Sequence, residues 1–204
     1  MRVSNYDLQM QAAGRSFLAC STEEIAARFG LQRDAQWLYV SFLSAPHRIS
    51  LTEGRVEEKR NGQWNPASFH TSMTIYDLLA NPNGRPVLSG TWCAHDALNA
   101  VRSGTLRGKL VGVPPEAARL FSGKQDRLAH ACKFLGGTPV SGGDYACILP
   151  IFDFFPVLLR FWDADEEFPA QLQLLWDQNT PRYLHFETTF YTIQAIIERL
   201  KSLL

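Results

Sequence analysis

Two adjacent apolar segments near the end of the chain, Tyr145–Phe152 and Val157–Trp162, limit the fold more than any other pattern in the sequence. Apolar residues run through both segments without regular polar alternation, as in strands at the middle of a sheet that is covered on both faces. Pro150, Arg160 and the linker Asp153–Pro156 interrupt the apolar run, so it cannot form a membrane-spanning helix. The sequence therefore predicts a pair of buried strands.

Helical patterns lie at both ends of the chain. Residues 1–30 are expected to be mainly helical, because Ser21 and Glu24 form a capping box and Gly30 suits the left-handed end of a helix. Residues 187–204 carry a single apolar stripe, which is typical of an amphipathic helix. Shorter helices are expected at 68–80, 114–121, 125–135 and 168–177.

Strands and irregular structure are predicted for the middle of the chain. Residues 37–42 have the alternation of a strand, and residues 47–51 and 55–58 are predicted to form a hairpin around Thr52-Glu53-Gly54. Residues 85–112 have poor periodicity, which fits either an irregular functional loop region or short strands with bends.

The expected fold class is α+β. We expect a single domain, residues 1–204, in which a central mixed or antiparallel sheet is flanked by helices and the long C-terminal helix packs on that sheet. The expected parts are an N-terminal helical segment (1–30), a sheet and irregular region (36–112), helices (114–135), a strand pair (145–162) and the C-terminal helix (187–204).

Composition and charge narrow the range of functions. The chain has 204 residues, of which 46% are hydrophobic, enough to build a packed core. Its 20 basic and 20 acidic side chains balance, whereas binding to nucleic acid needs a clustered basic excess. The same balance argues against a polybasic membrane patch. We therefore expect a small molecule or a protein as the partner, and neither nucleic acid nor a membrane.

The N-terminus and the cysteines bear on localisation. Residues 1–7 contain no apolar run behind their single basic residue, so no secretory signal is expected. The four cysteines form no C-x-x-C pair, so no iron–sulfur or paired-cysteine zinc site is expected, and no other cofactor is identified. The prediction is a cytoplasmic protein with four reduced thiols. They are Cys20, Cys93, Cys132 and Cys147.

An acidic loop at residues 163–167 is the first candidate for chemistry. Its carboxylates could bind a hard cation through oxygen ligands, although their spacing is not that of an EF-hand. The alternative is a solvated turn that places negative charge before the helix expected at 168–177. Trp162 and Phe168 flank the loop and are expected to anchor it to the core. The candidate ligands are Asp163, Asp165, Glu166 and Glu167, the first three as metal ligands.

Two histidine-containing pairs and one turn are further candidates. His95 is followed by Asp96, and His185 lies two residues before Glu187. Neither pair matches a zinc signature, and capping or structural hydrogen bonding is the alternative for Glu187. Asp144 follows a pair of glycines at the start of a predicted strand, where a carboxylate can bind turn amides.

Several of these motifs occur in an order that is shared with a known family. They are Gly136-Gly137, Gly143-Asp144, Pro150, Pro156, Trp162, Asp163-x-Asp165-Glu166-Glu167-Phe168-Pro169, Asp177 and Tyr183-Leu184-x-x-Glu187. Upstream motifs are Glu23-Glu24-Ile25-Ala26, Tyr76-Asp77-Leu78-Leu79 and Ser89-Gly90-Thr91-Trp92. In this order they resemble the bacterial and archaeal family described as domain of unknown function 3786, from about Leu18 to Leu200.

The resemblance carries expectations of its own. Family members are typically from anaerobes, and some carry an added cysteine-rich iron–sulfur module that this chain lacks. Residues 184–188 depart from the family pattern, which tends to have a proline after the leucine and an acidic pair. No reaction is established for the family. Because its motifs include the acidic loop, Asp144, Asp177 and Glu187, the resemblance implies that these carboxylates converge, either to bind a cation or to transfer protons. Capping of strands and helices above Trp92 and Trp162 is the alternative.

Three functional hypotheses follow. The first is a protein that binds a small molecule or a partner in a groove beside Trp92 and the conformationally anchored acidic loop. The second is a cation-dependent enzyme that uses the carboxylates of the 163–167 loop together with Glu187. The third, which only the resemblance suggests, is an accessory protein of a redox or cofactor-handling system. The candidate ligand-binding residues are Trp92, His95, Asp144, Trp162, Asp163, Asp165, Glu166, Glu167, Asp177 and Glu187.

Overall fold

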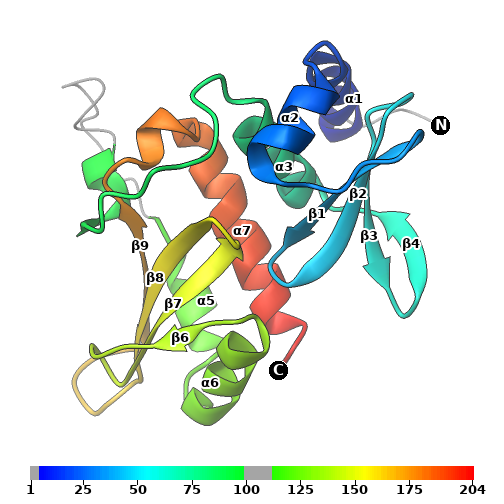
Figure 1. Cartoon of the computed structure of the whole chain (residues 1–204). Coiled ribbons are helices and arrows are strands. Elements are labelled where there is room, and N and C mark those ends of the chain that lie inside the picture. The colour runs from blue at the N-terminus through cyan, green and yellow to red at the C-terminus, as the bar shows by residue number, and fades with distance from the viewer. Residues whose placement is uncertain (1–4, 99–111) are drawn as a thin grey trace. The chain divides into compact units, whose positions relative to one another are not determined.

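The computed structural model describes residues 5–98 and 112–204, which form helices and two antiparallel sheets (Figure 1). The α+β prediction is confirmed, with the strands divided between the two sheets. The chain divides into two compact units, which are described separately. Unit 1 comprises Met1–Arg85 and Tyr183–Ala195, and unit 2 comprises Pro86–Arg182 and Ile196–Leu204.

Unit 1 contains two helices, a four-stranded sheet and a third helix in chain order. The elements are α1 (Asn5–Leu18), α2 (Thr22–Phe29), β1 (Trp37–Phe42), β2 (Ala45–Ser50), β3 (Val56–Arg60), β4 (Gln63–Pro66) and α3 (Phe69–Ala80). Each strand pairs antiparallel with the next one, in the order β1-β2-β3-β4. Asn61 and Gly62 both have positive φ between β3 and β4, which matches the twist of a two-residue hairpin. The predicted hairpin around Thr52-Glu53-Gly54 is confirmed as β2 and β3.

Local sequence signals set the ends of the helices in unit 1. The Ser21 hydroxyl accepts a hydrogen bond from the Glu24 amide (3.3 Å) at the start of α2, and Gly30 ends that helix with φ 68°. Ser68 caps α3 in the same way through the Thr71 amide (3.2 Å). The predicted capping at Ser21 and Gly30 is therefore confirmed.

The long C-terminal helix α7 (Phe186–Lys201) begins in unit 1 and ends in unit 2. Within unit 1 its start is tied to α3. The hydroxyl groups of Thr74 and Thr192 are 3.2 Å apart, and both are buried. The Asp77 carboxylate accepts hydrogen bonds from the amide (2.8 Å) and the imidazole of His185, just before α7. The start of α7 is thus held by polar contacts in addition to its apolar stripe.

Unit 2 is built on a five-stranded antiparallel sheet. Its elements are β5 (Trp92–Cys93), α5 (Pro115–Arg119), α6 (Gln125–Phe134), β6 (Thr138–Pro139), β7 (Tyr145–Phe152), β8 (Phe155–Trp162), β9 (Gln171–Asp177) and the 3-10 helix η1 (Thr180–Arg182). The strand order is β5-β9-β8-β7-β6. Leu149, Val157 and Leu159 are fully buried, as expected for the predicted strand pair.

The prediction of a helix at residues 168–177 is wrong, because Gln171–Asp177 form strand β9. The sequence from Gln171 to Leu174 alternates polar and apolar residues, which is the period of a strand. β9 pairs antiparallel with β8, from Leu158 opposite Leu175 to Trp162 opposite Gln171. The free edge of β8 therefore decided the structure of a segment whose short pattern had been read as helical.

Two points concern the remaining predictions. The irregular region predicted at 85–112 contains the short strand β5, and residues 99–111 lie outside the described part of the chain.

Within the described ranges, 5–98 and 112–204, no helix has both the length and the apolar character needed to cross a membrane.

Candidate functional site

The acidic loop of unit 2 is held by hydrogen bonds from its own carboxylates to backbone amides. Asp163 accepts hydrogen bonds from the Ser122 hydroxyl (2.9 Å) and from the amides of Gly123 (2.9 Å) and Ala164 (2.7 Å). Partial burial alone would raise the pKa of Asp163, but these hydrogen bonds outweigh burial and lower it. Asp163 therefore fastens the loop to the turn that follows α5.

Asp144 and Asp165 act in the same way at the two sides of this loop. The Asp144 carboxylate accepts a hydrogen bond from the backbone amide of Asp163 (2.7 Å). Asp165 accepts from the amides of Phe168 (2.7 Å) and Glu167 (2.9 Å), and these bonds lower its pKa. The structure thus brings Asp144 and Asp163 together, but as acceptor and backbone donor and not as two ligands of one ion.

The structure does not group the side chains of Asp163, Asp165 and Glu166 as ligands of one ion. Glu166 and Glu167 are exposed at the tip of the loop. In residues 5–98 and 112–204, no three His, Cys, Asp or Glu side chains are grouped so that they could hold a metal ion. The carboxylates of Asp163 and Asp165 accept hydrogen bonds from backbone N–H groups, a role that differs from the predicted solvated turn before a helix.

The flanking aromatic residues do not anchor the acidic loop as predicted. Trp162 is 36% exposed and Phe168 is 59% exposed. The loop is held instead by hydrogen bonds from backbone amides to carboxylates. Trp162 is the last residue of β8, and Phe168 lies between β8 and β9, where neither is fully buried.

Asp177 is the most buried of the predicted site residues, with 1% of its surface exposed. It accepts hydrogen bonds from the amides of Ser89 (3.0 Å), Gly90 (2.9 Å) and Asn179 (2.9 Å) and from the Ser89 hydroxyl (3.1 Å). Four donors therefore converge on this one carboxylate and fix the Ser89-Gly90 turn against the end of β9.

Trp92 and the acidic loop lie at opposite ends of β9. Trp92 pairs with Asp177, whereas Trp162, which begins the loop, pairs with Gln171. Six strand residues span about 20 Å. The predicted groove beside both Trp92 and the acidic loop is therefore not formed by these residues.

His95 and Glu187 are the two remaining candidates. His95 is buried and packs beside Trp176, with ring centres 6.3 Å apart. Burial lowers the pKa of His95 and keeps its imidazole neutral. Glu187 is exposed in the first turn of α7 and belongs to unit 1. His95 thus lies near the end of β9 that pairs with Trp92, opposite the end next to the acidic loop.

A cavity of about 430 Å³ in unit 1 is a further candidate site, which the sequence did not indicate. It lies where α1, the β2–β3 turn, the end of β4 and α3 meet, and we call it the Tyr76 pocket. The exposed charged and polar residues at its rim are Asp7, Gln11, Glu53 and Arg55. The more buried residues beneath them are Met10, Gly54, Val56, Ala67, Ser72 and Tyr76, with Pro66 at the edge.

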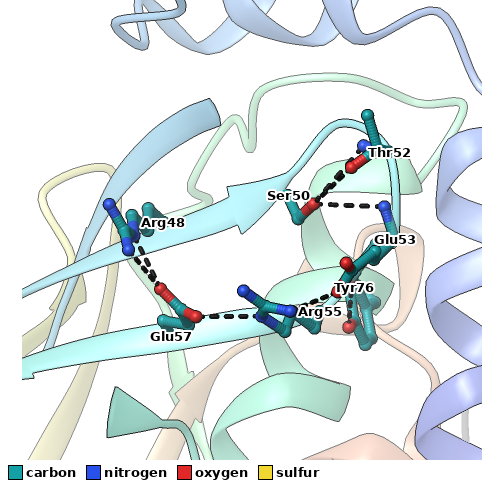
Figure 2. Close-up of polar contacts among 8 residues, drawn as sticks. Arg48, Ser50, Thr52, Glu53, Arg55, Glu57 and Tyr76 are labelled. Carbon is teal, nitrogen blue, oxygen red and sulfur yellow. Dashed lines mark hydrogen bonds and ion pairs between the residues drawn. The ribbon is translucent and has the colours of Figure 1, made fainter. Parts of the chain in front are cut away.

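Tyr76 connects the floor of the pocket to the β2–β3 turn (Figure 2). Its hydroxyl donates a hydrogen bond to the carbonyl oxygen of Gly54. Burial raises the pKa of Tyr76 to about 12, so the hydroxyl remains a donor at neutral pH. The Ser50 hydroxyl holds the same turn by accepting hydrogen bonds from the amides of Glu53 (3.1 Å) and Thr52 (3.4 Å). The β2–β3 turn, which forms one wall of the pocket, is thus held in place before any ligand binds.

A row of side chains with alternating charge, Arg48, Glu57 and Arg55, crosses β2 and β3 beside the pocket, as Figure 2 shows. Glu57 accepts hydrogen bonds from Arg48 Nε (2.7 Å) and Arg55 Nε (2.9 Å), and Arg55 also pairs with Glu53. Burial alone would raise the pKa of Glu57, but the bonds from Arg48 and Arg55 outweigh it and lower the pKa. The guanidinium of Arg55 is therefore already shared by two carboxylates.

Arg48 is further held between two aromatic rings on the same face of the sheet. Its guanidinium carbon lies 3.7 Å from the ring centre of Trp37 and 4.4 Å from that of Trp64. Stacking of this kind suits arginine because its guanidinium is planar and delocalised. Arg48 is thus a structural group that positions Glu57, which in turn positions Arg55 at the rim.

Sequence reasoning missed the Tyr76 pocket. One signal was present, because Glu53, Arg55 and Glu57 follow each other at a spacing of two, which places alternating charges on one face of a strand. The other lining residues come from α1 and α3, which are distant in sequence from the turn. Their meeting at Gly54 has no local sequence signature.

Comparison with known proteins identifies the family alone. No curated protein and no solved structure matches the chain. A family model described as a domain of unknown function (DUF3786) matches residues 21–199, which is nearly the whole chain. This match confirms the resemblance seen in the ordered motifs. The chain belongs to the family described as domain of unknown function DUF3786.

Proposed function

We propose that this chain is a small-molecule-binding protein and that the Tyr76 pocket is its ligand site. The observation that carries the proposal is a concave cavity of about 430 Å³ with a buried floor and a charged rim, all within one compact unit. Known ligand pockets have volumes of about 300–1,000 Å³ and combine apolar walls with a few fixed polar groups. The Tyr76–Gly54 hydrogen bond supports such preorganisation.

The charges at the rim favour a ligand that carries a cationic nitrogen. Asp7 and Glu53 contribute two carboxylates, and Arg55 contributes one guanidinium that is already bound to Glu53 and Glu57. Carboxylates therefore outnumber the guanidinium among the charged residues that line the pocket together with the apolar side chains of Val56 and Ala67. We infer that the ligand has a compact apolar body, which the floor accommodates, and an amino group directed to the rim.

A pair of matched probes tests both the site and the ligand class. The melting temperature is measured with 2-phenylethylamine and with 3-phenylpropionate, each at the same millimolar concentration and ionic strength. A ligand that binds only the native state raises the melting temperature by mass action. We expect a rise with the amine and none with the carboxylate. Chemical shift changes in an NMR titration should include the amides of Gly54 and Tyr76.

Three variants locate the effect. Glu53→Gln removes one rim charge and should weaken amine binding about tenfold, whereas Ala67→Leu narrows the floor and should abolish it. Glu166→Gln is the matched control, since it removes an exposed carboxylate in unit 2. Equal shifts with both probes, or amine binding that survives Glu53→Gln and Ala67→Leu, would contradict the proposal.

We also infer that the protein works in the cytoplasm and binds neither nucleic acid nor a membrane surface. Its four free cysteines support a reducing compartment. Its equal numbers of basic and acidic residues support the absence of a polyanionic partner. Cell fractionation and a filter-binding assay with duplex DNA test the two statements separately.

A further inference from the structure

Two hydroxyl-bearing residues of α3 lie among the buried residues that line the Tyr76 pocket. Gly54, Val56 and Ala67 have no polar side-chain atom, whereas Ser72 and Tyr76 each carry a hydroxyl group. Both are almost fully buried, with 3% of Ser72 and 5% of Tyr76 exposed. The polar side-chain groups of this buried lining are therefore two hydroxyl oxygens.

Helical spacing places Ser72 on the same face of α3 as Tyr76. Residues four apart in a helix lie one above the other, about 6 Å apart along the axis. The Tyr76 hydroxyl reaches Gly54 in the β2–β3 turn, so this face of α3 is turned toward the cavity. Thr74 lies on a different side of the helix, where its hydroxyl contacts that of Thr192 (3.2 Å). Ser72 therefore carries its hydroxyl on the cavity side of α3.

The hydrogen-bonding capacity of the two hydroxyls decides what a ligand must supply at the floor. Tyr76 donates its proton to the carbonyl oxygen of Gly54, so toward a ligand its hydroxyl can only accept. The Ser72 hydroxyl has two lone pairs and can accept as well. Neutral acceptors do not compensate the desolvation of an ammonium group, which the carboxylates at the rim bind better. The floor therefore suits a neutral donor.

We propose that Ser72 determines the specificity of the Tyr76 pocket and that the ligand is an amine whose opposite end carries a hydroxyl group. This inference rests on the proposed function and extends it from the rim to the floor. The amino group of the ligand lies at the rim carboxylates, and its hydroxyl donates a hydrogen bond to Ser72 Oγ. The apolar body fills the space between these two ends, beside Val56 and Ala67.

A buried acceptor of this kind discriminates against ligands that bring no donor. An apolar ligand end displaces water from the Ser72 hydroxyl and leaves it without a replacement hydrogen bond, whereas a ligand hydroxyl restores that bond. One such hydrogen bond corresponds to about a tenfold difference in affinity.

Three amines with the same framework test the floor of the pocket. They are 2-phenylethylamine, tyramine, which has a hydroxyl group at position 4 of the ring, and 2-(4-methylphenyl)ethylamine, which has a methyl group of similar size there. Dissociation constants for the full chain are measured by isothermal titration calorimetry. We expect tyramine to bind about tenfold more tightly than the other two amines. Burial of apolar area alone would favour the methyl compound instead.

A serine variant assigns the effect to one residue. Ser72→Ala removes the acceptor, so tyramine binding should weaken about tenfold while binding of 2-phenylethylamine changes less than about twofold. Ser41→Ala is the matched control, because it makes the same substitution at an exposed position of β1 in unit 1. Thermal melts of both variants without ligand, followed by circular dichroism, show whether the fold is retained.

The outcomes separate this inference from the proposed function. If none of the three amines binds, the ligand class of the pocket is wrong and the role of Ser72 is overturned with it. If all three bind equally well, or the methyl compound binds most tightly, the proposed function stands and the role of Ser72 is overturned. A preference for tyramine that persists in Ser72→Ala overturns it equally. If Ser72→Ala does not fold, the comparison of the three amines on the wild type decides.

Discussion

The backbone of Gly54 lies directly against the backbone of Gly14, so closely that a Cβ on Gly54 would be 2.5 Å from the Gly14 carbonyl oxygen. In the other direction, a Cβ on Gly14 would be 3.0 Å from the Gly54 carbonyl oxygen and 3.3 Å from the Tyr76 hydroxyl. Since Tyr76 also donates a hydrogen bond to Gly54, α1, α3 and the β2–β3 turn meet at one point. Gly54 and Tyr76 also line the Tyr76 pocket.

The first prediction concerns Gly54→Ala. The positive φ of Gly54 (+73°) costs an alanine about 1–2 kcal/mol, and the collision with Gly14 adds to it. We expect the free energy of unfolding to fall by about 2–4 kcal/mol, as measured by urea denaturation and circular dichroism. Gly62→Ala is the matched control, because φ is +80° there and nothing lies within 4 Å of the added Cβ. Equal losses in the two variants would show that the contact with Gly14 is unimportant.

The second prediction concerns the buried carboxylate of Asp177. Asp177→Ala leaves four donors of Ser89, Gly90 and Asn179 without their acceptor, so the free energy of unfolding should fall by more than about 3 kcal/mol. Asp177→Asn keeps one acceptor oxygen and should lose about half as much. The exposed Asp153→Ala serves as the control and should change stability by less than about 0.5 kcal/mol. A tolerated Asp177→Ala would mean that the Ser89-Gly90 turn is held by other contacts.

The third prediction is a pH dependence that arises at Glu57. Its pKa in the folded chain is lowered from 4.5 by the hydrogen bonds from Arg48 and Arg55, although burial opposes them. A lowered folded pKa contributes stability that is present above the unfolded value and is lost as the pH falls through the folded value. Urea midpoints of the wild type should therefore decline below about pH 4.5. In Glu57→Gln the midpoint should be lower at pH 7, and the decline should be shallower than in a Glu166→Gln control. Parallel curves for all three proteins would assign the acid sensitivity to other groups.

The fourth prediction concerns divalent cations. Asp163 and Asp165 already accept hydrogen bonds from Gly123, Ala164 and Phe168, and in residues 5–98 and 112–204 no three possible ligand side chains are grouped to hold a metal ion. Millimolar Mg²⁺, Mn²⁺, Ca²⁺ or Zn²⁺ should shift the melting temperature no more than sodium chloride at equal ionic strength does. A cation-specific rise that disappears in Asp165→Asn would revive the metal site at this loop.

Several elements could be predicted from the sequence because their signals are local. The cap at Ser21 and the helix end at Gly30 each depend on groups within about four residues. The hairpin around Gly54 likewise follows from the short pattern on its two sides. Residues 171–177 show the limit of such signals, because their short pattern was read as helical and pairing with β8 made them a strand.

The arrangement of the candidate carboxylates of unit 2 could be predicted only in part. The sequence placed carboxylates at 144, 163 and 177, and the structure brings the first two together while Asp177 lies at the far end of β9. Each of them accepts hydrogen bonds from backbone amides, which is the kind of role expected for Asp144 and differs from the cation binding or proton transfer that the resemblance implied for the set. The number of amides that reach a carboxylate depends on how distant loops fold, and no spacing along the chain encodes it.

Periodicity, turn residues and caps determined the helices and hairpins of this protein, because each acts through neighbours a few bonds away. The charge balance and the cysteine spacing likewise followed directly from the residues. Tertiary packing alone decided that Tyr76 reaches Gly54 and that Asp177 accepts hydrogen bonds from the amides of Ser89 and Gly90. Contacts of that kind form when separate elements bury their apolar faces against one another, and many residue orders meet that requirement equally well.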